Sequence, residues 1–380
     1  AQDPLVVDEG MLKNFVSSAS VQDQQLFDEV FADGFFTSLI ENYLEKGVRF
    51  DDIAANMGDF MKRYEQIVSH PSFKELLEAQ QADSALLDAE ANSYAKIRAW
   101  EMREKGIILA GDISYFVQPY KSSVTGFGNG LASALLESFI SNNFSTQEID
   151  QFLEQLPKVY KILLSGKDEK GNPLFSVDTT LPTFKADMLN AKKLKAASFA
   201  KTMKKYAISK VGQDPLDLSA EAAAAAAAIG DGTNGSSLAW HLQGKAFALT
   251  RTLVENGITE TEKFLPLLGE CNALFTIEGI NKKSLIFQLD YEVAVKRKVA
   301  DLIYFAEQQG IPVTDLISGS GFATVEEYVR DLYQRDRSWI LEGKSFAFAK
   351  SMYELNVPKE KVREYYHKYQ TIFNVLKERP

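Results

Sequence analysis

The sequence predicts an all-α fold of tandem helical hairpins, arranged either as an α-helical repeat array or as a two-lobed bundle. Three observations lead to this prediction. Apolar residues recur at three- and four-residue steps along most of the chain, one pattern of helix and stop occurs four times, and a second, looser pattern fills the intervals. The chain has 380 residues, of which 45% are hydrophobic, so it can bury one large core or a run of smaller ones.

Four segments, which we call type-one copies, align without gaps over a helix and the turn that follows it. Each copy begins with Gly, has Gly or Asn 13 residues later, and continues at once with an apolar residue. Because Gly and Asn tolerate a positive φ best, each should end its helix in the left-handed conformation, with the apolar residue folding back onto the last turn. The copies are Gly34–Val48, Gly130–Phe144, Gly244–Ile258 and Gly343–Val357, and their stops are Gly47, Asn143, Gly257 and Asn356.

A second helix should follow each stop. Ser145 and Glu148 have the spacing of a capping box, in which each side chain accepts a backbone amide proton of the other residue. Thr259 and Glu262 repeat that spacing. Apolar residues continue at helical steps beyond these positions. Each type-one copy is therefore predicted to be a helix–turn–helix of roughly 35 residues.

The intervals between type-one copies hold a looser hairpin, which we call type two. Its copies are Ser93–Ile107, Ser198–Gly212 and Val299–Ile311, which share a helical apolar pattern and a Gly near the stop. Successive type-one copies start 96, 114 and 99 residues apart. The two hairpin types therefore alternate with a joint period of about 100 residues, much longer than that of the common solenoid repeats.

One segment is the best candidate for a boundary between two halves. Residues 167–184 combine turn residues with β-branched residues. They divide the chain into an acidic N-terminal helical lobe (residues 1–166), a connecting segment (167–184) and a C-terminal helical lobe (185–380), each lobe with two type-one copies. Further along, the Ala222–Ala228 run predicts a helix that ends in a Gly-rich loop at Gly230–Ser237.

The net charge of −10 is unevenly distributed. Residues 1–100 contain 18 Asp and Glu against 8 Lys and Arg. An acidic surface repels phosphate groups, so we expect no nucleic-acid partner. The local exception is Phe184–Lys210, whose lysines favour a solvated helix face; an anionic partner, or docking onto the acidic N-terminal region, are the alternatives. The residues of this lysine patch are Lys192, Lys193, Lys195, Lys204 and Lys205.

The cysteine content and the hydropathy of the chain bear on the cellular compartment in which the protein is found. The single Cys271 excludes an intrachain disulfide and lies in an apolar segment, which favours a buried small side chain over a nucleophile. No window reaches the roughly 18 consecutive apolar residues of a transmembrane segment. Ala1 fits a mature chain after signal-peptide removal and equally a trimmed chain. We therefore expect an exported protein, periplasmic or secreted, with a soluble cytoplasmic protein as the alternative.

The sequence predicts no catalytic, cofactor-binding or metal site. Glu364 and His367 have the spacing that places two ligands on one helical face, but di-iron helical bundles need a second such pair. Gly-rich stretches at Thr125–Gly130 and Ser318–Gly321 lack the preceding strand that a nucleotide-binding βαβ unit requires. We therefore interpret both stretches as loops between helices.

Aromatic residues open the type-one helices and recur in the last helix. The pattern favours packing between hairpins, with an apolar groove for a peptide, lipid or partner helix as the functional alternative. These candidate partner-binding residues are Phe35, Phe36, Phe247, Phe346, Phe348, Tyr365, Tyr366 and Tyr369.

The repeat and the absence of catalytic motifs together predict a non-enzymatic interaction or scaffold protein that binds a polypeptide partner or associates with itself. A carrier of a hydrophobic small molecule, held in an apolar cavity between helices, is the first alternative. An enzyme whose site is assembled from distant residues is the second.

Overall fold

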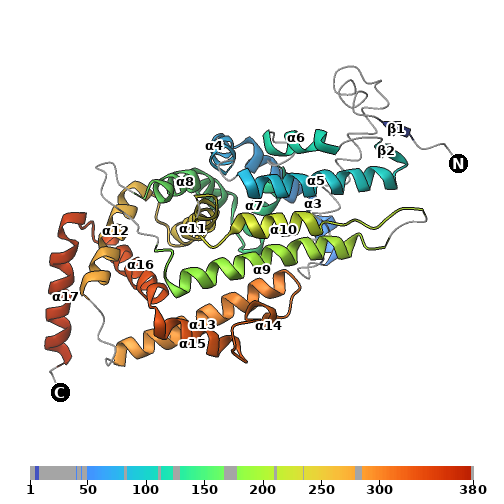
Figure 1. The fold of residues 1–380 in the computed structure, drawn as a ribbon. Helices are drawn as coiled ribbons and strands as arrows, with labels where there is room; N and C mark the ends of the chain where they lie inside the picture. Colours follow the sequence, from blue (N-terminus) through green and yellow to red (C-terminus); the bar gives the residue numbers. More distant parts are fainter. Residues whose placement is uncertain are drawn as a thin grey trace.

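The computed structural model describes residues 5–7, 40, 44, 49–80, 84–109, 113–122, 129–166, 178–208, 212–233, 235–278 and 285–377. These residues are almost entirely helical, so the predicted all-α class is confirmed (Figure 1). Among the described helices, none combines the length and hydropathy that crossing a bilayer requires.

Helices follow one another along the described part of the chain. They are α3 (Phe50–Ser69), α4 (Pro71–Gln80), α5 (Ser84–Glu104), α6 (Val117–Ser122), α7 (Asn129–Ser141), α8 (Thr146–Ser165), α9 (Pro182–Lys205), α10 (Ser219–Ile229), α11 (Gly235–Glu255), α12 (Thr261–Glu278), α13 (Leu285–Gln308), α14 (Val313–Leu316), α15 (Val325–Arg335), α16 (Ser338–Glu354) and α17 (Val362–Lys377), with 3-10 turns η1 (Ile113–Phe116) and η3 (Lys359–Lys361).

The structure also contains two short strands that the sequence does not predict. β1 (Leu5–Val7) and β2 (Ile107–Leu109) pair in parallel, with Leu5 opposite Ile107. β2 begins directly after Gly106, whose φ of 83° ends α5. The strands are too short for a period-two pattern to be visible in the sequence.

Three of the four predicted helix stops lie in the described residues, and all three are confirmed. Asn143, Gly257 and Asn356 have φ values of 55°, 65° and 53°. At the first stop the Phe144 amide donates to the Phe139 carbonyl at 2.8 Å, which is the six-to-one bond of a Schellman motif. The equivalent bonds, both 2.9 Å, run from Ile258 to Leu253 and from Val357 to Met352. The fourth stop, Gly47, lies outside the described residues.

Replacing Gly257 with Val should lower the free energy of unfolding by about 1 kcal/mol or more. A Cβ at Gly257 would meet no atom within 4 Å, so the loss would come from the positive φ and not from a clash. Gly244 in α11 is the matched control, because its surroundings are equally open and its φ is not positive. Gly244→Ala should be neutral or stabilising in urea unfolding. Equal stability of Gly257→Val and the parent would contradict the stop.

One of the two predicted capping boxes is confirmed. The Glu148 amide donates to Ser145 Oγ at 3.3 Å, and the Ser145 amide donates to the Glu148 carboxylate at 2.7 Å. The second prediction was wrong, because the carbonyl of Glu260 starts α12 by accepting the amide of Phe264 at 3.0 Å, which leaves Thr259 one residue outside the cap.

The predicted loop at Gly230–Ser237 is shorter than expected. The alanine run forms α10 as predicted, but α11 already begins at Gly235. Gly232 has a φ of 84°, and a Cβ there would come within 2.0 Å of Phe184 Cε1. A glycine is therefore needed where this loop crosses α9.

Helices of successive type-one copies pack in order. α3 contacts α7, α8 contacts α11, and α12 contacts α16. In each case the helix after a stop packs against the helix that opens the next copy. A second group of helices lies side by side, with α10 between α5 and α9 (Figure 1). Next to them, α15 contacts both α9 and α13.

The largest core cluster extends from Phe60 in α3 to Val362 at the start of α17. It includes residues on both sides of the predicted connecting segment, and α9 begins at Pro182, within that segment. The division into two lobes stays a prediction. Cys271 belongs to this core with no exposed surface, and burial raises the pKa of its thiol to about 12. Its predicted burial is confirmed.

Candidate functional site

The candidate aromatic residues fall into two groups. Phe247 and Phe346 pack between hairpins: their ring centroids lie 5.1 Å from Phe152 and 5.3 Å from Phe264. Both contacts join the second helix of one type-one copy to the first helix of the next. These two rings therefore take part in packing between hairpins, which is the interpretation that the sequence pattern favoured. Phe35 and Phe36 lie outside the described residues.

The second group lies at the C-terminal end. The ring centroids of Tyr366 and Tyr369 lie 5.7 and 6.1 Å from that of Phe348 in α16. Tyr366 is half-buried, whereas 45% of Tyr369 is exposed. Tyr365 is half-buried under the ammonium group of Lys368, 5.3 Å from its ring centroid. Only Tyr369 of the described candidates thus presents much surface to solvent.

The predicted lysine patch is largely engaged within the chain. Lys193 Nζ donates to the carbonyls of Leu316 and Ser318, both at 2.9 Å, at the end of α14. Lys195 forms an ion pair with Glu90 of α5, in the acidic N-terminal region. Of the remaining members, Lys192 is half-buried, whereas Lys204 and Lys205 are exposed, and Lys205 Nζ lies 5.3 Å from the ring centroid of Tyr206.

A cleft of about 780 Å³ lies between α9, α11, α12, α13 and α16. Two tryptophans, Trp240 and Trp339, line it together with Phe184 and Phe247. Its polar lining includes an ion pair between Lys245 and Glu342, 2.6 Å apart. The lining therefore combines aromatic side chains with a few polar groups, as small-molecule sites do.

Asp187 organises the polar side of the cleft. Its two carboxylate oxygens accept from Lys298 Nζ at 2.9 Å and from Trp339 Nε1 at 3.0 Å. The Lys298 ammonium also lies 4.0 Å from the Trp339 ring centroid, where the face of the indole attracts a cation. These contacts fix the orientation of Trp339 at the wall of the cleft.

His241 adds a neutral imidazole to the cleft. Its ring lies edge-on to Phe184, with centroids 4.7 Å apart. Burial is the largest influence on this residue and lowers the pKa of His241 below its ordinary value. The ring is consequently uncharged near neutral pH.

The residues of the cleft do not form a recognisable catalytic set. Among the described residues, no group of three or more His, Cys, Asp and Glu side chains could hold a metal ion. Asp187, the best-placed carboxylate, is occupied by its two donors. The Glu364 and His367 pair of α17 is equally unsuited, because Glu364 bonds Lys368 at 2.5 Å and His367 is exposed.

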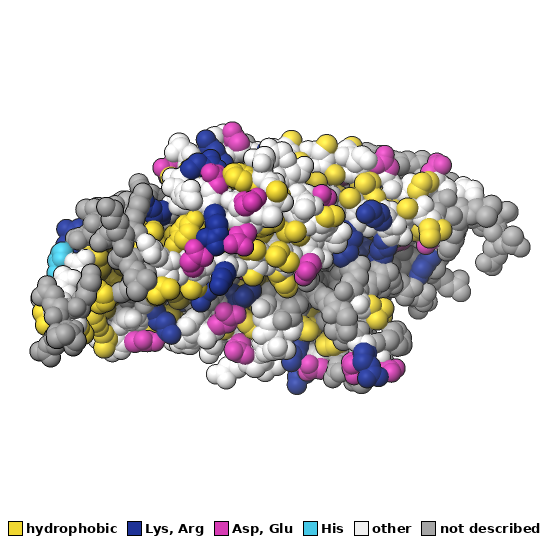
Figure 2. Space-filling model, turned by 90° about the horizontal axis from the view of Figure 1, so that it is seen from below, with side chains coloured by type: hydrophobic (Ala, Val, Ile, Leu, Met, Phe, Trp, Pro, Cys, Tyr) yellow, Lys and Arg dark blue, Asp and Glu magenta, His cyan; other side chains and the backbone are white. Residues whose placement is uncertain are grey.

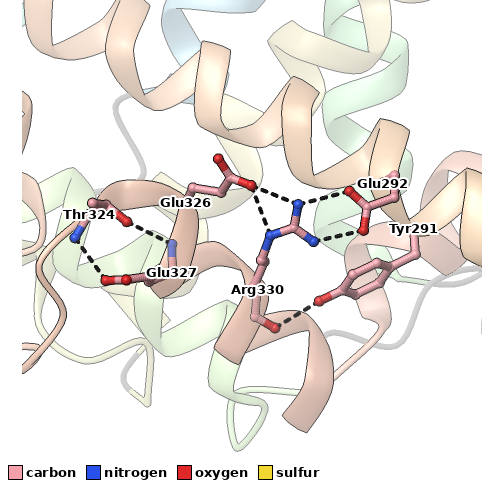
Figure 3. A network of polar contacts seen from close by, with 6 residues as sticks. All are labelled: Tyr291, Glu292, Thr324, Glu326, Glu327 and Arg330. Carbon is pink, nitrogen blue, oxygen red and sulfur yellow. Dashed lines mark hydrogen bonds and ion pairs between the residues drawn. The ribbon is translucent and has the colours of Figure 1, made fainter.

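A polar network outside the cleft joins α13 to α15 (Figure 3). Arg330 donates to both carboxylate oxygens of Glu292 at 2.8 Å, and to Glu326 at 2.7 Å. Hydrogen bonds from Arg330 lower the pKa of Glu292. The Tyr291 hydroxyl donates to the Arg330 carbonyl at 3.1 Å, so every member has a structural partner. The network holds two helices together and offers no free group for chemistry.

An exposed apolar row remains on the last helix. We name Tyr369, Ile372, Phe373 and Leu376 the α17 seam; their exposed fractions are 45%, 56%, 47% and 61%. Hydrophobic side chains are visible in Figure 2 at the end of the molecule that α17 occupies in Figure 1. Five of the 15 large hydrophobic side chains that are exposed in the described part lie between Tyr369 and Leu376. Such a concentration marks an interaction surface more often than a solvated one.

No protein family, curated protein sequence or solved structure matches this chain.

Proposed function

We propose that this chain is a non-enzymatic interaction protein, a tandem array of helical hairpins that binds a polypeptide partner or associates with itself. The observation that carries the proposal is the α17 seam, an apolar row at helical spacing that the described part of the chain leaves uncovered. Faces of this kind bind helices laid along them. The expected export of the chain stays a prediction.

The tandem arrangement is part of the proposal. It is supported by the three matched stops and by the order of contacts, in which α3, α8 and α12 each pack against the helix that opens the next copy. In a repeat array each unit buries its apolar face on a neighbour, so a face that stays uncovered needs a partner. Within the described residues, no helix packs along the α17 seam as α11 packs along α8.

Native mass spectrometry of the protein purified from its natural source tests this function. We expect a homo-oligomer or a complex with a polypeptide. A monomer that carries a small molecule in stoichiometric amount would instead favour the carrier. A chemical conversion catalysed by the purified protein would contradict the non-enzymatic assignment.

The second candidate function is a carrier of a hydrophobic small molecule, which the aromatic cleft favours. Its volume of about 780 Å³ lies in the range of ligand pockets. The faces of Trp240, Trp339 and Phe184 would contact an apolar ring, and Lys245 or Glu342 would contact a polar end.

Filling the cleft should abolish such binding. Gly244 lines the cleft, and a Cβ added to it would meet no atom within 4 Å, so Gly244→Phe can place its ring there without a backbone clash. We expect the variant to bind the probe anilinonaphthalene sulfonate about tenfold more weakly at this site, as measured by tryptophan quenching. Gly343 opens the next type-one copy in equally open surroundings and does not line the cleft, so Gly343→Phe is the control. Equal probe binding by the two variants would remove the support for a carrier.

A further inference from the structure

α17 and α8 occupy the same position in their type-one copies. Counted from the stops at Asn356 and Asn143, the apolar residues of the two helices fall at identical positions without a gap. The seven equivalent pairs are Val362 with Ile149, Tyr365 with Phe152, Tyr366 with Leu153, Tyr369 with Leu156, Ile372 with Val159, Phe373 with Tyr160, and Leu376 with Leu163.

The burial of these equivalent positions differs sharply. In α8 none of the seven side chains is more than 3% exposed. In α17 the exposed fraction rises from 1% at Val362 to 61% at Leu376. The two helices therefore present the same apolar row, and only the row on α8 is covered along its whole length.

The cover on α8 is supplied by neighbouring helices. α11, the helix that opens the next copy, packs along α8, and α4 packs on it as well. α17 packs on α12 and η3 near its N-terminal end, and Phe348 of α16 reaches no further than Tyr369. Nothing in the described part of the chain takes the place on α17 that α11 takes on α8.

We propose that the α17 seam docks the α17 helix of a second copy of this chain, in an antiparallel pair related by a two-fold axis. This inference rests on the proposed interaction function and names its partner. The seam suits a helix because its exposed residues Tyr369, Phe373 and Leu376 follow one another at steps of four and three residues.

The apolar helix surfaces that a second copy leaves uncovered indicate which of its helices would occupy the seam. The helices that open the described copies, α7, α11 and α16, already pack against second helices of their own chain. In the described part of the chain, α13 also exposes apolar side chains between Leu289 and Phe305, but charged residues interrupt them. The α17 seam is an uninterrupted apolar row that a second copy offers as well. Residues 369–376 contain no charged side chain, so two antiparallel seams meet at their centre without like charges facing each other.

The expected interface is small. The four side chains of the seam are about half exposed, and large apolar side chains carry roughly 150–250 Å² each, so a symmetric pair buries on the order of 600–1,000 Å² in total. This area lies at the low end of specific interfaces. The dimer should therefore dissociate on dilution in the micromolar range.

Sedimentation velocity of the full chain tests the pairing. Between about 1 and about 100 μM the weight-average sedimentation coefficient should rise from the monomer towards the dimer value. Phe373→Ser should weaken association by about tenfold or more, because it places a hydroxyl at the centre of the seam. Phe305→Ser is the matched control, since Phe305 is 50% exposed on α13 and should leave association unchanged. Thermal unfolding of dilute samples should be the same for both variants.

Two results overturn the pairing: a monomer at all concentrations, or association that Phe373→Ser leaves unchanged. The proposed function is judged separately. If the monomeric chain binds a polypeptide in native mass spectrometry and Phe373→Ser abolishes that complex, the interaction function stands and self-pairing falls. If the chain is monomeric and binds no polypeptide, both fall.

Discussion

Replacing Phe152 with Ala should lower the free energy of unfolding by about 3–5 kcal/mol, because the whole ring lies in the core. Phe152 has no exposed surface. Its ring centroid lies 5.1 Å from those of Phe139 and Phe247 and 6.1 Å from that of Phe144. Truncation removes these contacts and leaves a cavity that three surrounding rings cannot fill without moving.

The effect should be specific to the joint between α8 and α11. Phe305→Ala deletes the same atoms from a ring that is 50% exposed, and it should change the free energy of unfolding by no more than about 0.5 kcal/mol. Urea unfolding followed by circular dichroism measures both. A loss below about 1 kcal/mol for Phe152→Ala would show that the two type-one copies do not depend on this contact.

Replacing Asp336 with Ala should lower the free energy of unfolding by about 2–4 kcal/mol at pH 7. One carboxylate oxygen accepts the Thr183 amide at 3.1 Å and the Thr183 hydroxyl; the other accepts the Ser338 amide at 2.8 Å and hydroxyl at 2.5 Å. Asp336 and Thr183 are 7% and 2% exposed. The substitution therefore leaves buried donors at the start of α9 without an acceptor.

The same carboxylate gives a pH dependence with a defined sign. Burial by itself would raise the pKa of Asp336, but the four hydrogen bonds outweigh burial, and its pKa is lower than in an unfolded chain. The contribution of the ionised group is then fully present above the unfolded pKa of about 3.9 and is lost as the pH falls through the lower folded value. The difference between the parent and Asp336→Ala should shrink as the pH falls below about 4.

Asp178 provides the control for this second prediction. It accepts the Thr180 amide at 2.9 Å and hydroxyl at 2.6 Å in the same local geometry, but it is exposed. Asp178→Ala should change stability little at any pH, because water replaces the lost acceptor. An equal effect of the two substitutions would contradict the role given to burial at Asp336.

The sequence predicted correctly those features that depend only on residues adjacent to one another in the chain. The stops at Asn143, Gly257 and Asn356 depend on a residue that tolerates positive φ and on the apolar residue after it. The failed capping box at Thr259 shows the limit of this reasoning, since the adjacent Glu260 carbonyl could start the helix as well.

The cleft could not be predicted because its residues come from five helices. Asp187 and Lys298 are separated by more than a hundred residues, and each of them is by itself an ordinary surface-type residue. The α17 seam was visible only in part. Its spacing placed Tyr369 among the candidate aromatic residues, but the sequence could not show that the equivalent row on α8 is covered.

The order in which the helices cover one another also bears on how this polypeptide could be shortened. α12 is covered by α16, with Phe264 of α12 resting against Phe346 and Tyr353 of α16. Removing α16 and α17 together would uncover the apolar face of α12 and expose Phe264, which now has no contact with water. A cut within a hairpin would leave a helix without its companion. Deletion of complete hairpins should thus leave a folded chain whose last helix exposes more apolar surface than α17 does, and which therefore associates more readily.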